Sequence, residues 1–188
     1  MVLMLPSLAL ALLCLLQAGA EVPVQPDFSA EKFAGPWHLV AAVSNCSVFL
    51  KMKDEMKSAI ITISILPEGD LAMKVLWPLM DKCQKFELLF QQSGQAGHYL
   101  GTFWGPLAAE EKRELRVLDT DYSHYAILHE AQWSGQRPKT MLQLFTREQD
   151  PSPQLLQTFR ELIPTLGLTE DMLAVLPPSA DQCTEATR

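Results

Sequence analysis

The side chains with the most reactive chemistry in this chain of 188 residues are its four cysteines. A cysteine thiol can act as a nucleophile, form a disulfide or stay free. Cys14 lies in a segment that we expect to be removed, which leaves Cys46, Cys83 and Cys183. In an oxidising compartment, an odd number of cysteines allows at most one internal disulfide and leaves one thiol over.

The segment around the first of these cysteines offers a second kind of chemistry. Asn45, Cys46 and Ser47 form an Asn-x-Ser sequon, the acceptor sequence for an N-linked glycan. We therefore name Asn45 as a candidate glycosylation site. A glycan there would add mass that amidase treatment removes.

Other patterns of catalytic or metal-binding residues do not occur in the sequence. It contains no Gly-x-Ser-x-Gly nucleophile motif and no His-Glu-x-x-His zinc motif. His124 and His129 are five positions apart across the junction of a loop and a strand, so they do not converge as ligands on a helix. We predict no metal site and no cofactor, and we expect the four histidines to be satisfied residues of the surface or the rim.

The balance of charge argues against nucleic acid as a partner. The chain has 15 basic and 22 acidic side chains, which gives a formal net charge of -7. Neutralising phosphates requires clustered Lys and Arg, whereas the positive charges of this chain are scattered. We therefore exclude nucleic-acid binding.

The first 20 residues have the features of a secretory signal peptide. They contain no charged side chain, are apolar over Leu8–Leu16, and end with the small residues Ala18-Gly19-Ala20. The apolar run is shorter than the roughly 20 residues that span a bilayer, and no later apolar run is long enough. We predict cleavage before Glu21, secretion without a membrane span, and one domain over residues 21–188.

The middle of the chain has the pattern of short β-strands separated by turns. Alternation is clearest at Ile61, Ile63 and Ile65, which share one face. Pro67-Glu68-Gly69-Asp70 then forms a turn, because Pro fixes φ and Gly accepts a positive φ. Eight sequential strands with hairpin-length loops predict an antiparallel up-and-down barrel or a sandwich. The expected strands begin at Trp37 and continue over Ser58–Ile65, Leu71–Trp77, Lys85–Gln91, His98–Phe103, Glu114–Asp119, Tyr125–Glu130 and Thr140–Thr146.

One segment near the C-terminus has the pattern of a long α-helix. Ser152 can cap it, Pro153 suits its first position, and apolar residues recur on one stripe until Pro164. A short final strand is expected over Met172–Leu176. The predicted fold class is all-β with one C-terminal α-helix outside the sheet. An eight-stranded barrel is just wide enough inside for side chains or one small ligand.

Three motifs resemble those of the lipocalin family, whose fold is an eight-stranded up-and-down barrel. Gly35-x-Trp37 follows a short helical turn, Thr120-Asp121-Tyr122 lies between the sixth and seventh expected strands, and Arg147 ends the eighth. All three occur in the order and at the spacing of that family. The surrounding sequence is similar to the branch of lipocalin-type prostaglandin D synthase, the complement component eight gamma chain and lipocalin-15, and closest to lipocalin-15-like proteins.

The resemblance implies structural roles for these residues. Trp37 would close one end of the barrel with the Arg147 guanidinium over its face, a contact of about 0.5 to 2 kcal/mol. Cys83 and Cys183 correspond to the family disulfide that ties the C-terminal tail to the barrel wall. Cys46 is then the spare thiol. It is free or capped by a small thiol, bonded to another chain as in the complement gamma chain, or used in ligand chemistry.

The same branch of the family contains an enzyme, so catalysis has to be considered. Lipocalin-type prostaglandin D synthase carries its catalytic thiol on the second strand, pointing into the barrel. The matching position in this chain is Ala59 or Ile60, and neither can act as a nucleophile. Cys46 lies earlier, in the loop after the first strand, and does not simply replace that thiol. We expect no enzyme activity.

A barrel that works as a container would have an apolar lining with a few polar groups. We expect a monomer that carries a small hydrophobic ligand, such as a retinoid, a fatty acid or a similar lipid. The rival hypothesis is an interaction subunit that docks a partner protein through the barrel mouth or Cys46, and a solid core is the alternative to a cavity. The residues expected to point inward are Leu39, Met73, Val75, Trp77, Phe86, Leu88, Met141, Gln143 and Phe145.

Overall fold

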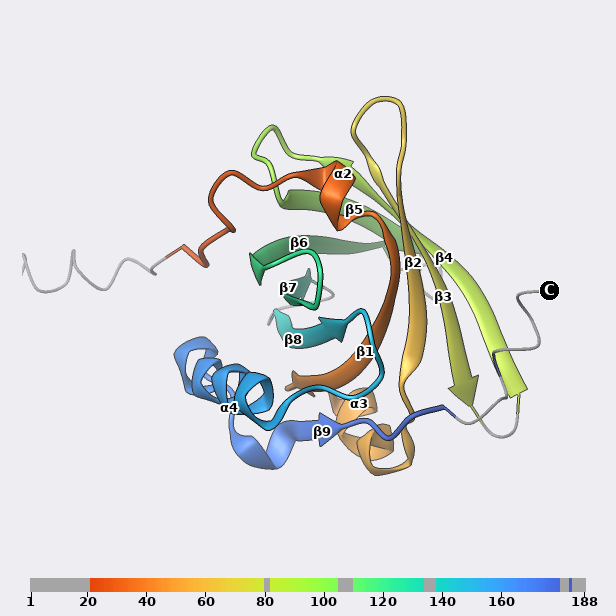
Figure 1. The fold of residues 1–188 in the computed structure, drawn as a ribbon, viewed down its shortest axis with the longest axis vertical. Helices are drawn as coiled ribbons and strands as arrows, with labels where there is room; N and C mark the ends of the chain where they lie inside the picture. The colour runs from red at the N-terminus through yellow and green to blue at the C-terminus, as the bar shows by residue number, and fades with distance from the viewer. Residues whose placement is uncertain (1–20, 80–81, 105–109, 134–137, 180–182, 184–188) are drawn as a thin grey trace, which may run out of the picture.

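The computed structural model describes residues 21–79, 82–104, 110–133, 138–179 and 183. Within these residues, eight strands follow one another along the chain and a short ninth strand follows the C-terminal helix (Figure 1). The predicted signal peptide, residues 1–20, lies outside the described residues. The strands are β1 (Gly35–Ser44), β2 (Ala59–Ile65), β3 (Leu71–Leu79), β4 (Lys82–Gln92), β5 (His98–Trp104), β6 (Glu110–Thr120), β7 (Tyr125–Trp133), β8 (Lys139–Thr146) and β9 (Leu173–Val175).

The sheet closes on itself into a barrel. Its strand order is β2-β3-β4-β5-β6-β7-β8-β1-β9, and β1 also pairs with β2, which places Trp37 opposite Ile61. Every neighbouring pair of strands is antiparallel. The prediction of an up-and-down barrel is therefore confirmed, and the sandwich is ruled out.

Trp37 and Arg147 close one end of the barrel. The Trp37 side chain is fully buried, and its Nε1 donates a hydrogen bond to the Phe33 carbonyl oxygen at 2.8 Å. The Arg147 guanidinium lies 3.6 Å from the centroid of the Trp37 ring. It also donates, at 2.9 to 3.1 Å, to the backbone carbonyl oxygens of Lys32, Ala34, Pro36 and Tyr122.

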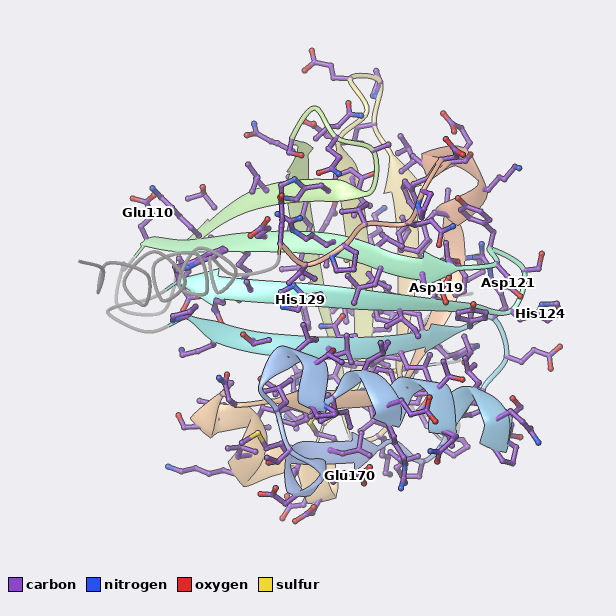
Figure 2. All side chains as sticks on the ribbon, turned by 90° about the vertical axis from the view of Figure 1, so that its left-hand side faces the viewer. Glu110, Asp119, Asp121, His124, His129 and Glu170 are labelled. Carbon is purple, nitrogen blue, oxygen red and sulfur yellow. A yellow bond between two sulfur atoms is a disulfide. The ribbon has the colours of Figure 1, made fainter. Side chains whose placement is uncertain are left out.

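The Thr120-Asp121-Tyr122 loop packs on the same end, beside the short helix α2 (Ala30–Phe33). The Tyr122 hydroxyl accepts a hydrogen bond from the Ser29 N–H at 3.0 Å. Asp121 Oδ1 accepts from three backbone N–H groups, and Figure 2 shows Asp121 and His124 together beyond the ends of the strands. Burial tends to raise the pKa of Asp121, but these hydrogen bonds and the His124 ring outweigh it and hold that pKa below its usual value.

The helix α4 (Pro153–Leu162) lies on the outside of the barrel, as predicted (Figure 1). The Ser152 side chain caps it by accepting a hydrogen bond from the Leu155 N–H at 3.2 Å. Phe159 and Ile163 are fully buried between α4 and the sheet. The outward-facing residues that they cover are Val40, Ile127, Leu142 and Leu144.

A disulfide joins the C-terminal tail to the barrel wall. Cys83 on β4 is bonded to Cys183, with the two Cα atoms 5.3 Å apart and 100 positions between them in the sequence. This is the pairing that the family resemblance implies. Cys46 is the free cysteine of the described residues.

The loop between β1 and β2 contains a helix that the sequence did not predict. α3 (Ser47–Met52) continues directly into the 3-10 turn η1 (Lys53–Glu55). Its N-cap residue, Cys46, makes no side-chain capping hydrogen bond, and the helix has only six residues. Its sequence therefore carries neither a cap signal nor enough turns for a visible period. The remaining 3-10 turns are η2 (Pro164–Leu166) and η3 (Glu170–Met172).

The first residues that the structure describes cross the outer face of β6. The Arg116 guanidinium donates to the Val22 carbonyl oxygen at 2.9 Å and to the Glu21 carboxylate at 3.0 Å. The Gln25 N–H donates to the Val117 carbonyl oxygen at 2.8 Å. This N-terminal segment is thus hydrogen-bonded to the barrel and not a loose tail.

One expectation about the histidines is wrong. His129 lies opposite Arg116 in the middle of β7 and is only 6% exposed, so it belongs neither to the surface nor to the rim (Figure 2). Its Nδ1 has no hydrogen-bond partner among the described residues. Burial lowers the pKa of His129, and Arg116 lowers it further, while Glu114 raises it. The strand pattern did not reveal this burial, because alternation places His129 on the outer face of β7 and says nothing about what packs over that face.

Candidate ligand-binding site

The inside of the barrel contains a cavity of about 370 Å³. Ligand pockets in proteins range from about 300 to 1,000 Å³, so this one is large enough for a small organic molecule. Its lining includes Ser44, at the end of β1, and Lys139, at the start of β8, which places it toward the end of the barrel opposite Trp37. All nine residues expected to point inward line it, namely Leu39, Met73, Val75, Trp77, Phe86, Leu88, Met141, Gln143 and Phe145.

One side of the cavity is apolar. In the β3–β4 register Met73 lies opposite Leu88 and Val75 opposite Phe86, so these alternate residues face inward together. On β2 the inward positions are again apolar. We call this lining of β2, β3 and β4 the apolar wall, and its members are Ala59, Ile61, Met73, Val75, Trp77, Phe86 and Leu88.

The other side of the cavity is polar. Arg113 on β6 donates from Nη1 to Glu130 Oε1 at 3.2 Å and from Nη2 to Glu111 Oε2 at 3.3 Å. Gln143 Nε2 donates to Glu130 Oε2 at 3.4 Å, and Gln132 donates to the Glu111 carboxylate. We call these five residues the polar cluster. All but Glu111 line the cavity.

The polar cluster is held in place by packing as well as by hydrogen bonds. The Arg113 guanidinium lies 4.6 Å from the centroid of the Phe103 ring, and its Nε is buried with no partner among the described residues. Burial raises the pKa of Glu130, although Arg113 and Gln143 favour its ionised form. The cluster is thus a half-buried ion-pair network on one side of the cavity.

Of this cluster, the sequence predicted only Gln143 to point inward, because no inward position was assigned on β6 or β7. The alternation of residues along β7 carried the missing information. Leu128 and Ala126 follow the same alternation as Glu130, and Arg113 is opposite Gln132 in the β6–β7 register. Applying the same alternation to the rest of β7, whatever its residue types, would have placed Glu130 and Gln132 inside the barrel.

The mouth of the cavity is bordered by α3 and the residues that follow it. Phe49 is buried and packs beside Leu39 and Met141, whereas Val48 is 61% exposed. The lining at this end, which the sequence did not predict, also includes Ser44, Cys46, Met52, Met56, Lys139 and Thr140. The short helix therefore partly covers the entrance with flexible apolar side chains.

Cys46 and Asn45 lie at this mouth. The Cys46 side chain is half-buried and lines the cavity, so the spare thiol faces the same space as the apolar wall. The Asn45 side chain is exposed, and its Oδ1 accepts a hydrogen bond from the Thr140 N–H at 2.9 Å. Glycosylation of Asn45 stays a prediction.

Ala59 and Ile60 are the two positions that could match the catalytic thiol of lipocalin-type prostaglandin D synthase. Ala59 is 3% exposed and lines the cavity, whereas Ile60, the next residue on β2, faces the outer side. Ala59 is therefore the position from which a side chain of β2 would reach a ligand. An alanine there carries no group that can attack or protonate a substrate.

The described part of the chain contains neither a membrane-spanning helix nor a cluster of metal ligands. None of its helices is long and apolar enough to cross a membrane. Among the same residues, no three His, Cys, Asp or Glu side chains lie close enough together to hold a metal ion.

A closed antiparallel barrel with an internal cavity and one helix on its outside defines the class of small-molecule-binding β-barrels. The model of the lipocalin / cytosolic fatty-acid binding protein family matches residues 34–180. The chain belongs to the lipocalin family.

Individual relatives cover most of the chain. Lipocalin-15 of Homo sapiens is 40% identical over 88% of this chain and 86% of its own length. Extracellular fatty acid-binding protein of Coturnix japonica is 37% identical over 95% and 94%, and prostaglandin-H2 D-isomerase of Equus caballus is 30% identical over 90% and 87%. A solved structure of the siderocalin Ex-FABP, described as functioning through dual ligand specificities, is similar with a TM-score of 0.67 and 32% identity over 80% of this chain and 97% of its own.

Proposed function

We propose that this protein is a secreted carrier that holds one small hydrophobic molecule inside its barrel and does not alter it chemically. The observation that carries the proposal is the cavity of about 370 Å³ with its apolar wall. Transfer of apolar ligand surface from water into such a cavity contributes roughly 25 cal/mol per Å² buried. The ligand class is a retinoid, a fatty acid or a similar lipid, and a relative is named for binding fatty acids.

Methionines at the cavity support a carrier that accepts related ligands. Met52, Met56, Met73 and Met141 all line it. Methionine has three rotatable bonds and a polarisable sulfur, so it fits its shape to different partners. A panel of related lipids should bind with affinities that differ little from one apolar body to another.

Secretion is supported by three observations. Residues 1–20 have the sequence features of a signal peptide, a disulfide joins Cys83 to Cys183, and relatives are named as extracellular proteins. Disulfides persist in oxidising compartments. The carrier is expected to be a monomer unless Cys46 bonds another chain.

The absence of isomerase activity is part of the proposal, although a prostaglandin-H2 D-isomerase is among the relatives. Its support is Ala59, which occupies the inward position on β2. Cys46 is the remaining thiol at the cavity, so the test is to incubate the protein with prostaglandin H2. Turnover that disappears in Cys46→Ser would contradict this part of the proposal.

Native mass spectrometry of protein purified from its own secretion tests the carrier directly. We expect a bound lipid, or stoichiometric uptake of one lipid from a broad apolar panel. A matched pair of variants locates it. Ile61→Trp fills the cavity from β2, and Ile60→Trp makes the same change on the outer side of the same strand. Binding should weaken at least about tenfold in the first variant and stay unchanged in the second.

If Ile61→Trp does not fold by circular dichroism, Met141→Trp replaces it, because Met141 is half-buried near the mouth and its change disturbs the core less. Failure of the wild-type protein to carry or bind any lipid of the panel would overturn the carrier. Equal loss in Ile60→Trp and Ile61→Trp would place the ligand outside the barrel.

The second candidate function is an interaction subunit. Val48, 61% exposed, and the half-buried thiol of Cys46 lie together at the mouth, where a partner protein could contact both. Gels of secreted protein run with and without reductant separate the two functions. A heavier species that reductant or Cys46→Ser removes would favour the interaction subunit, whereas its absence together with lipid uptake favours the carrier.

A further inference from the structure

Removing charges from water is costly even when it is incomplete, and the side chains of Arg113, Glu111 and Glu130 are only 24%, 21% and 13% exposed. Replacing a buried ion-pair network with packed apolar residues is often neutral or stabilising. The apolar wall shows that such residues occupy the opposite side of the same cavity. Arg113, Glu111 and Glu130 therefore contribute something that an apolar lining would not.

We propose that the polar cluster binds the headgroup of the ligand, and that this headgroup is an uncharged hydroxyl. The ligand is then an apolar alcohol and not the anion of a fatty acid. This inference rests on the proposed carrier function. It assigns each end of the ligand to one side of the cavity, with the apolar body on the apolar wall.

Charge in the polar cluster argues against an anion. Both Nη atoms of Arg113 already donate to carboxylates, at 3.2 Å to Glu130 and 3.3 Å to Glu111. One guanidinium and two carboxylates sum to a charge of -1, or zero when Glu130 is protonated. An entering carboxylate would meet no net positive charge there and would lose its hydration.

Hydrogen-bonding capacity in the cluster favours a hydroxyl. A hydroxyl donates one hydrogen bond and can accept up to two. It can donate to Glu130, whose Oε2 has, among the described residues, only a long contact of 3.4 Å with Gln143. It can accept from Gln143 Nε2, which otherwise donates to the Met141 sulfur at 3.0 Å, and a thioether is a weak acceptor. An ammonium could not accept this bond.

Lys139 offers a competing location for an anionic headgroup. It lies opposite Gln132 on β8, closer to the mouth than Glu130, and lines the cavity. If Lys139 held the carboxylate of a fatty acid, the hydrocarbon chain would lie over the polar cluster and cover its polar groups. Such a placement desolvates the carboxylates without a hydrogen bond in return. If Lys139 held the anion, Lys139→Gln would lose dodecanoate binding.

The experiment compares compounds with one apolar body and different headgroups. Dodecanol, dodecanoate, dodecylammonium and dodecyl methyl ether displace a fluorescent lipid probe from the full secreted protein. We expect dodecanol to bind about tenfold more tightly than either ion, and also more tightly than the ether, which accepts but cannot donate. Tenfold corresponds to about 1.4 kcal/mol, the size of one good hydrogen bond.

Variants assign the preference to the cluster. Glu130→Gln removes a negative charge from the cluster, so the ratio of dodecanol to dodecanoate affinity should fall about tenfold. Glu110→Gln makes the same chemical change at the mouth end of β6, on an exposed side chain, and should leave the ratio unchanged (Figure 2). If Glu130→Gln does not fold, Gln143→Leu removes the amide donor without changing charge and should weaken dodecanol selectively.

Three results would overturn the inference while leaving the carrier intact. The first is tighter binding of dodecanoate or dodecylammonium than of dodecanol by the wild-type protein. The second is equal affinity for all four compounds. The third is a loss of dodecanoate binding in Lys139→Gln with no effect of Glu130→Gln on the ratio. Failure of every dodecyl compound and of the probe to bind would instead overturn the proposed function itself.

Discussion

The Arg147 guanidinium lies 3.6 Å from the centroid of the Trp37 ring and closes the barrel at the end opposite the cavity mouth. Its position is fixed by hydrogen bonds from its three nitrogens to four backbone carbonyl oxygens. One planar cation thus covers Trp37, the largest fully buried side chain among the described residues, and satisfies carbonyl groups of two distant segments, residues 32–36 and Tyr122. Only a forked donor can make these contacts together.

We predict that Arg147→Lys destabilises the fold by about 1 to 3 kcal/mol, because an ammonium keeps the charge but cannot reach the same carbonyls. Urea unfolding followed by circular dichroism measures the change. Arg160→Lys is the matched control, since Arg160 is exposed and makes only a 3.5 Å ion pair with Glu170. Equal effects of the two substitutions would contradict a special role for Arg147.

Gly35→Ala should destabilise the protein more than Gly94→Ala. Both glycines have a positive φ, +102° and +94°, so each alanine costs roughly 1 to 2 kcal/mol of backbone strain. A Cβ at Gly35 would also lie 3.2 Å from Arg147 Nη1, whereas one at Gly94 meets nothing within 4 Å. The difference between the unfolding midpoints of the two variants measures the contact with Arg147. A larger loss of stability in Gly94→Ala than in Gly35→Ala would contradict the prediction.

Removal of the disulfide in Cys83→Ser/Cys183→Ser should lower the free energy of unfolding by up to about 4 to 5 kcal/mol, the chain-entropy value for a loop near 100 residues. The denaturant midpoint of the oxidised wild type provides the reference. Cys46→Ser is the control, because it changes a thiol and leaves the bond between Cys83 and Cys183 intact. If the reduced wild type is as stable as the oxidised one, the bond contributes nothing.

Stability should fall in mild acid because of His129. Its pKa is lowered in the folded protein, mainly by burial, so the unfolded chain binds more protons below pH 6.5. Stability from this group is complete above pH 6.5 and declines as pH falls toward the folded pKa. His129→Gln should reduce that slope, and adding His38→Gln should reduce it further, since burial lowers the pKa of His38 as well. Unfolding curves across this pH range measure how the free energy of unfolding changes with pH. If the double variant keeps the slope of the wild type, the assignment to His129 and His38 is wrong.

Much of the barrel could be predicted from the sequence because its register is tied to recognisable residues. Trp37 and Arg147 mark where the first and eighth strands meet, and alternation from those points placed Leu39 and Phe145 inside. Turns and β-branched runs located the other strands. The helix α4 was equally visible, because Ser152 and Pro153 give it a capped start.

The rest depended on contacts between distant segments. The six residues of α3 are too few to show a period, and Phe49 anchors them through packing against the barrel. The burial of His129 likewise depends on packing over the outer face of β7, which alternation along a single strand does not show. Glu130 and Arg113 were not predicted to point inward, and their ion pair at 3.2 Å offsets part of the cost of removing them from water.

The hydrogen bonds that Glu21 and Val22 make with Arg116 have a practical consequence for anyone who produces this protein. A purification tag fused directly before Glu21 would extend a chain that is already fastened to the sheet, so its first residues would be crowded by β6. Shortening the start to Asp27 would remove two hydrogen-bond partners of Arg116. Expression designs should therefore begin at Glu21 itself or place the tag at the C-terminus.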